Sequence, residues 1–231
     1  MMKSSRALRA LLCGVALAAG FVGVRSAHAA PIVNLTGWTF GNGNTVNVAN
    51  PAHNGLAGGF TGSISGFGAP FDSPSFQTYC VEITQSFSLP SGNMSGYSIV
   101  PASAYAEWTL PTTANRIGQL ITYVNANPTA VDTAAESTSL QLAIWNSIYD
   151  TDSTLTGGSF LDTTSYAAYA DTLLAASAST VSNVNVFVLT NPNSQDFLVT
   201  TPVPEPETYA LVLAGLGAMA MVTRRRSRDR S

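Results

Sequence analysis

The chain has 231 residues with 13 acidic and 10 basic side chains, a net charge of −3, and the two kinds are distributed very unevenly. From residue 30 to residue 223 the only basic residue is Arg116, against twelve acidic residues, and no lysine follows Lys3. A surface of this kind repels phosphates and offers no basic groove, which excludes nucleic acid as a partner.

Residues 1–29 are predicted to be a signal peptide. A basic start precedes the apolar run ALLCGVALAAGFVGV. Ala27 and Ala29 then form a small-x-small cleavage site, so the mature chain would begin at Ala30. A membrane anchor is the alternative, but the apolar run is short and ends at the cleavage signal.

Residues 30–200 are long enough for one domain with its own core. Residues 32–40 and 45–50 are predicted strands, and the Gly-rich residues 55–70 are predicted to be a loop or a weak strand. Residues 75–89 alternate clearly between two faces and are predicted to form one long strand. On that strand the two faces would carry Tyr79, Val81 and Ile83 on one side and Phe76, Thr78 and Cys80 on the other.

The middle of the body changes to a helical period. Residues 114–127 repeat apolar side chains at i, i+3, i+4 and i+7, and further helices are predicted over 133–149 and 165–178. Strands over 183–190 and 194–201 close the domain. The order predicts an α+β fold, an antiparallel β-sandwich or barrel with an inserted helical subdomain.

After signal removal the chain would keep one cysteine, Cys80, and one histidine, His53. A lone thiol in an oxidising compartment is buried, paired between chains, or captured by an acyl group of the same chain. His53 lies in the turn-like segment NPAHNG and leaves a Cys–His hydrolase open, although no local protease signature accompanies it.

Metal ligands are too few to predict a metal site. Zinc would need more His or Cys side chains than the mature chain has. The segment from Asp150 to Ser153 resembles the start of a calcium loop, but Leu155 and Leu161 occupy the positions that need Gly and Glu. Solvation of a helix end explains these aspartates more simply, and weak calcium binding stays open.

Two motifs resemble the thioester domain of bacterial surface adhesins. Tyr79-Cys80-Val81-Glu82 matches the family's aromatic-Cys-aliphatic motif, and Leu140-Gln141-Leu142-Ala143-Ile144-Trp145 matches its apolar-Gln-x-Ala-Ile-Trp motif. The segment AYAEWTL, residues 104–110, is similar to the stretch between them. The resemblance covers residues 76–150, with weak support from residues 195–198.

The resemblance implies an internal thioester between the Cys80 sulfur and the Gln141 side-chain carbonyl, formed with loss of ammonia. Tyr79 and Trp145 would shield it, and Gln119 is a rival acyl donor without the surrounding motif. A surface amine or hydroxyl would attack the bond, giving single-use covalent attachment rather than enzymatic turnover, with no cofactor. The alternative is a non-reactive structural matrix protein with a buried thiol.

The absence of lysine after Lys3 can be interpreted in two ways. A chain with a reactive acyl group gains by lacking amines of its own, whereas compositional drift is the simpler account. The same absence excludes Lys–Asn isopeptide bonds.

Residues 201–231 form the most specific pattern. They combine the box Val203-Pro204-Glu205-Pro206, an apolar run over 209–222 and five arginines. This tail resembles the PEP-CTERM sorting signal of Gram-negative bacteria. The resemblance implies processing by an exosortase, a short hydrophobic helix that anchors the chain transiently in the inner membrane, and delivery to the cell surface or extracellular polysaccharide matrix.

Overall fold

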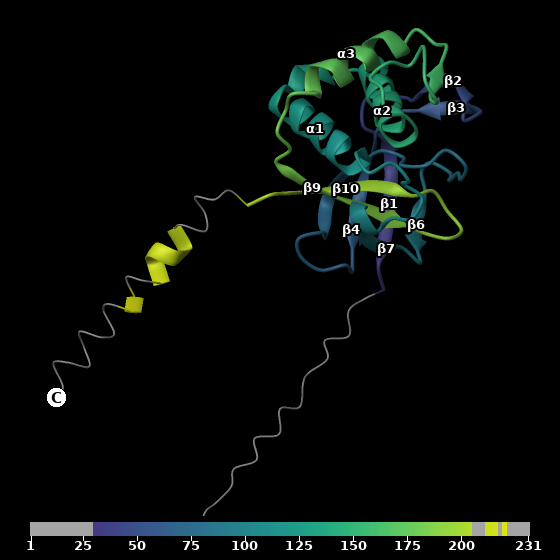
Figure 1. The fold of residues 1–231 in the computed structure, drawn as a ribbon. Coiled ribbons are helices and arrows are strands. Elements are labelled where there is room, and N and C mark those ends of the chain that lie inside the picture. The colour runs from purple at the N-terminus through teal and green to yellow at the C-terminus, as the bar shows by residue number, and fades with distance from the viewer. Residues whose placement is uncertain (1–29, 205–210, 217–218, 221–231) are drawn as a thin grey trace, which may run out of the picture.

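The computed structural model describes residues 30–204, 211–216 and 219–220 (Figure 1). The expected signal peptide lies outside these residues, as do the arginines of the tail and much of the expected C-terminal helix. Within the described ranges, none of the helices combines the length and apolar character needed to cross a bilayer. The body, residues 30–204, mixes helices with antiparallel sheets, which confirms the α+β class.

Three sheets make up the β part, and their neighbouring strands are antiparallel. The largest has the order β5-β4-β1-β6 and contains β1 (Ile32–Trp38), β4 (Phe60–Ser65), β5 (Ser73–Thr78) and β6 (Gly92–Ser95). The second has the order β10-β9-β7 and contains β7 (Ser98–Pro101), β9 (Val184–Thr190) and β10 (Phe197–Pro202). The smallest has the order β3-β2-β8 and contains β2 (Asn44–Asn50), β3 (His53–Ala57) and β8 (Leu161–Asp162). The described strands do not close into a barrel, so that part of the expectation is wrong.

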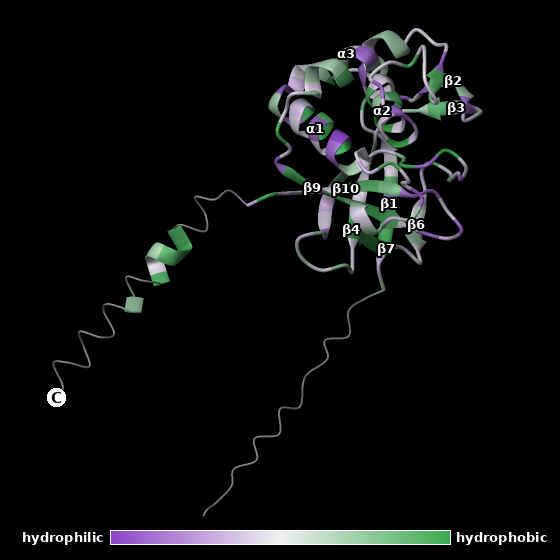
Figure 2. Ribbon diagram, viewed as in Figure 1, coloured by the Kyte–Doolittle hydropathy of each residue, from purple (hydrophilic) through white to green (hydrophobic). Residues whose placement is uncertain are grey.

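The helices lie on one side of the two larger sheets (Figure 1). They are α1 (Thr113–Ala126), α2 (Ala134–Tyr149) and α3 (Ala167–Ser177), with short 3₁₀ turns η1 (Ala102–Ala104) and η2 (Pro128–Ala130). Helix α2 begins at a capping box, in which Thr133 and Glu136 each bond the other's backbone N–H. Every residue from 137 to 148 of α2 is buried, which makes it the central helix of the core. Figure 2 shows the hydropathy of each residue along this helix and its neighbours.

Aromatic side chains hold the two larger sheets together. Phe60 of β4 and Phe197 of β10 lie 6.3 Å apart between ring centroids, and Phe87 packs edge-to-face against both, at 4.9 and 5.0 Å. Edge-to-face pairs of this kind add specificity to apolar burial. The contact places the start of β10 beside the end of β5, where Cys80 lies.

The predicted long strand over 75–89 is wrong beyond Thr78. After β5 the chain leaves the first sheet and pairs briefly with β10, through an isolated bridge between Cys80 and Phe197. The Glu82 side chain then accepts hydrogen bonds from Thr84 and from the backbone N–H of Gln85, which turns the chain. Residues 55–70 were expected to be a loop or a weak strand, and they include part of β3 and all of β4, which bears out the strand alternative.

Candidate functional site

Cys80 and Gln141 are joined by two hydrogen bonds. The Cys80 backbone N–H donates to Gln141 Oε1 at 2.9 Å, and Gln141 Nε2 donates to the Cys80 carbonyl at 2.8 Å. Both residues are buried, with 8% and 1% of their surfaces exposed. The segment after β5 supplies the cysteine and the centre of α2 supplies the glutamine, so two elements 61 residues apart in sequence meet at this point.

The two hydrogen bonds fix the Gln141 amide against the Cys80 backbone. A backbone N–H bound to the amide oxygen polarises the carbonyl and stabilises negative charge that develops there during attack. The amide is held in one orientation by the second bond, which fixes its carbon beside the cysteine. The Cys80 thiol is free, and burial, with a smaller contribution from Glu82, raises its pKa well above the usual value.

A cavity of about 470 Å³ reaches Cys80. Cys80, Trp145, His53 and Glu82 are among its lining residues. His53 packs edge-on against Trp145 at 5.4 Å between ring centroids. Three buried polar atoms of these residues, His53 Nε2, Glu82 Oε1 and Trp145 Nε1, have no hydrogen-bond partner among the described residues.

His53 shares the cavity with Cys80 but does not form a nucleophile–base pair with it. Hydrogen bonds of the described residues join neither ring nitrogen to the thiol, and burial lowers the pKa of His53 while Glu82 raises it less. The geometry therefore gives the Cys–His hydrolase no support. Helix α2, by contrast, supplies the Cys80 partner and the Trp145 indole from adjacent turns.

The remaining predicted site residues lie elsewhere. Tyr79 bonds the Ser137 hydroxyl at 3.3 Å and lines a different cavity, of about 190 Å³, against α1. Gln119 donates to the Ala178 carbonyl at the end of α3, so the structure does not bring it to Cys80. Shielding by Trp145, which lines the Cys80 cavity, stays a prediction.

The aspartates after α2 serve the backbone of their own loop. The Asp150 carboxylate accepts N–H bonds from Thr151, Asp152, Ser159 and Phe160. Arg116 donates to the Asp150 and Asp152 carbonyls and to Asn146 Oδ1. No group of three or more His, Cys, Asp or Glu side chains in the described part of the chain is placed to hold a metal ion.

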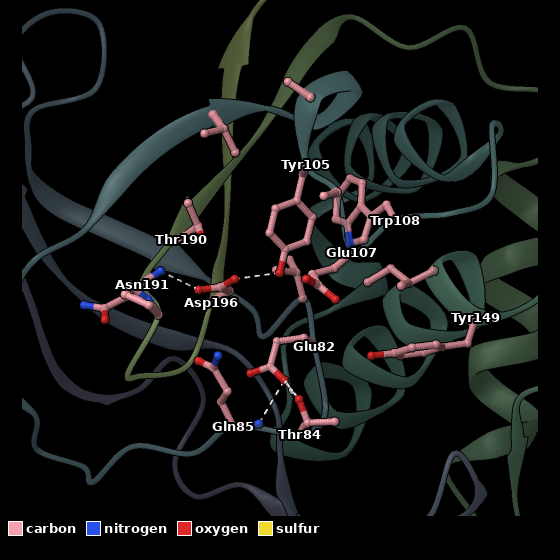
Figure 3. Close-up of a pocket in the computed structure, with 16 residues that line it drawn as sticks. Glu82, Thr84, Gln85, Tyr105, Glu107, Trp108, Tyr149, Thr190, Asn191 and Asp196 are labelled. Atoms are coloured by element: carbon pink, nitrogen blue, oxygen red, sulfur yellow. Dashed lines mark hydrogen bonds between the residues drawn. The ribbon is translucent and has the colours of Figure 1, made fainter.

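A second pocket, of about 630 Å³, was not predicted (Figure 3). Tyr105, Trp108 and Tyr149 line it together with three acidic side chains, Glu82, Glu107 and Asp196. The residues come from η1 and the segment after it, from the end of α2 and from the turn before β10. These segments lie far apart in the sequence. Some of its lining residues belong to segments noted for their resemblance, AYAEWTL among them, but nothing in those segments predicted a pocket.

Comparison with known proteins identifies the tail. Residues 202–226 match the PEP-CTERM protein-sorting motif. No curated protein and no solved structure matches the chain. The comparisons therefore do not support the thioester resemblance of the body, which stays a prediction. The motif in the tail implies an exported protein that an exosortase sorts to the surface of a Gram-negative bacterium.

Proposed function

We propose that the body carries an internal thioester between Cys80 Sγ and Gln141 Cδ, and that the exported protein uses it once to attach itself covalently to an amine or hydroxyl group. The observation that carries the proposal is the paired hydrogen bonding of the Gln141 amide with the Cys80 backbone. It holds the Gln141 amide against the backbone of Cys80 before any covalent bond forms.

The reaction balances without an oxidant or a cofactor. The Cys80 sulfur attacks Gln141 Cδ, the C–N bond of the amide breaks, and the thiol proton leaves with the nitrogen as ammonia. The step is uphill for free molecules, so rigid positioning and exclusion of water must supply the drive. The burial of both residues supports the exclusion of water.

Attachment follows from the same site. An external amine or hydroxyl enters the cavity that Cys80 and Trp145 line, attacks the acyl carbon and releases the thiol. The product is an amide or ester through Gln141. Because the acyl group is then consumed, each molecule reacts once. The sorting tail would bring this body to the cell surface or its extracellular matrix after a transient stay in the inner membrane.

Intact-mass measurement of the mature protein tests the proposal. The thioester form weighs one ammonia less than the sequence and takes up methylamine at Gln141. Cys80→Ala restores the full mass and abolishes uptake, yet keeps both hydrogen bonds because they come from the backbone of residue 80. Gln119→Ala is the matched control and leaves both the mass deficit and the uptake unchanged.

The competing function is that of a non-reactive surface protein in which Gln141 only fixes the backbone of Cys80. Full sequence mass together with one thiol that titrates after unfolding would establish that function and end the thioester proposal. A mass deficit that persists in Cys80→Ala would also end the thioester proposal, because the loss of ammonia would then not involve the cysteine.

A further inference from the structure

The 630 Å³ pocket differs in its lining from the cavity at Cys80, and Glu82 is shared between the two. Its described lining residues include three acidic side chains and no basic one. Three aromatic rings line the same space, so negative charge and π faces converge on one volume (Figure 3). A volume of this size is within the range that holds small organic ligands.

The aromatic side chains form a corner. The rings of Tyr105 and Trp108 meet at 88° with centroids 5.6 Å apart, and Tyr149 comes from the end of α2 on another side. The Tyr105 hydroxyl donates to Asp196 Oδ2 at 2.6 Å, which fixes the ring and the carboxylate together. Asp196 Oδ1 accepts the Asn191 N–H at 2.7 Å, so the acidic wall is rigid as well.

Glu82 supplies the observation that points to a ligand. This side chain is 6% exposed, and its Oε2 atom accepts all three bonds that turn the chain at Thr84 and Gln85. Its Oε1 atom is buried with no partner among the described residues, and Glu82 lines both this pocket and the cavity at Cys80. A buried carboxylate oxygen without a donor is costly, because it has lost its hydration without a replacement.

We propose that this pocket binds an organic ammonium cation without forming a covalent bond. Aromatic faces attract such cations through the ring quadrupole, and the acidic side chains supply charge that a neutral ligand would not use. The proposal is independent of the thioester, since a quaternary ammonium ion has no N–H and cannot attack an acyl group.

Titration with tetramethylammonium chloride, followed by calorimetry at matched ionic strength, tests this binding in the mature protein and in Cys80→Ala. We expect saturable binding of equal affinity in both. The neutral isostere 2,2-dimethylpropanol should bind on the order of tenfold more weakly, because it fills the same space without the charge.

Variants locate the binding. Glu82→Gln keeps an oxygen acceptor for the turn but removes the charge, and should weaken binding about tenfold. Trp108→Leu should weaken it about fivefold, whereas Trp108→Phe keeps a π face and should recover most of the affinity. Glu107→Gln changes an exposed residue of the pocket. It therefore measures the effect of removing one negative charge even if Glu82→Gln fails to fold. Asp132→Asn, an exposed acidic residue outside the lining, is the charge control.

Three results would overturn the proposal. They are equal binding of the neutral isostere, unchanged affinity in folded Trp108→Leu and Glu107→Gln, and competition by neutral saccharides in the absence of any ammonium binding. The last would assign the pocket to a hydroxyl-rich ligand instead.

Discussion

Gln141 and the Cys80 sulfur have separable roles, because the two hydrogen bonds between these residues use only the backbone of residue 80. Removing the sulfur leaves the amide paired. Removing the amide leaves a buried N–H and a buried carbonyl without partners, each of which costs about 1–3 kcal/mol. The fold therefore depends on the glutamine more than on the thiol.

The contribution of the Gln141 amide to stability can be measured in a protein that cannot form the thioester. In a Cys80→Ala background, which has no thioester, adding Gln141→Ala should lower the free energy of unfolding by about 2–4 kcal/mol. Urea unfolding of the two proteins gives the difference. Equal stabilities would mean that the Cys80 backbone groups find other donors and acceptors, and that the pairing is not a structural requirement.

Asp150 makes the stability of the loop after α2 depend on pH. Burial by itself would raise the pKa of this carboxyl, but hydrogen bonds from four backbone N–H groups outweigh it and hold the pKa below its ordinary value of 3.8. A carboxyl with a depressed folded-state pKa stabilises the fold above its unfolded-state pKa. That contribution is lost as the pH falls through the folded-state value.

We therefore expect Asp150→Asn to flatten the acid limb of the stability curve. Unfolding free energies measured from pH 7 down to about pH 2 should fall less steeply below about pH 4 in the variant than in the unaltered protein. Asp72→Asn, at an exposed carboxylate that accepts one N–H, is the control and should leave the slope nearly unchanged. Parallel curves for all three proteins would contradict the assignment.

At the scale of elements, the predicted bounds of helices and strands were correct where a short sequence motif fixes the backbone. Helix α2 begins where the sequence places it because Thr133 and Glu136 form a capping box, a signal contained within four residues. The strand over 75–89 failed because alternation continues through Val81 and Ile83 while the backbone has already turned. Both faces are buried there, between the sheets and α2, and alternation alone cannot distinguish that environment from a strand.

The capping box also predicts that replacing Thr133 costs more stability than replacing Thr112. Thr133→Ala should destabilise the protein by about 1 kcal/mol, because it removes the acceptor for the Glu136 N–H. Thr112 stands at the same position before α1 but makes no side-chain cap bond, so Thr112→Ala should cost a few tenths of that. Thermal unfolding of the two variants provides the comparison, and equal losses would show that the box adds nothing.

At the scale of the molecule, the site could be predicted from sequence only in part. The Cys80 and Gln141 motifs were visible because each is contiguous, and their pairing followed from a resemblance. The ammonium pocket could not be predicted, because its walls come from η1, α2 and the turn before β10. The local sequence around Asp196 or Tyr149 gives no sign that the two residues line the same pocket. Arg116 likewise joins α1 to the loop after α2 through long-range contacts.

The sorting tail and the folded body should be separable at residue 204. Strand β10 ends at Pro202, and the next backbone bond, from the Val203 N–H to the Asn183 carbonyl at 2.8 Å, closes the sheet. A chain of residues 30–204 should therefore unfold at the same temperature as residues 30–231 in detergent.

A chain that ends at Asp196 provides the contrast. It loses all of β10, including the Leu198 N–H that bonds the Tyr79 carbonyl and the bridge partner of Cys80. Because these contacts hold the cysteine segment against α2, this shorter chain should lose cooperative unfolding and any mass deficit together. Failure of residues 30–204 to fold would contradict the separation at residue 204. A mass deficit kept by the shorter chain would show that the Cys80 site does not depend on the pairing with β10.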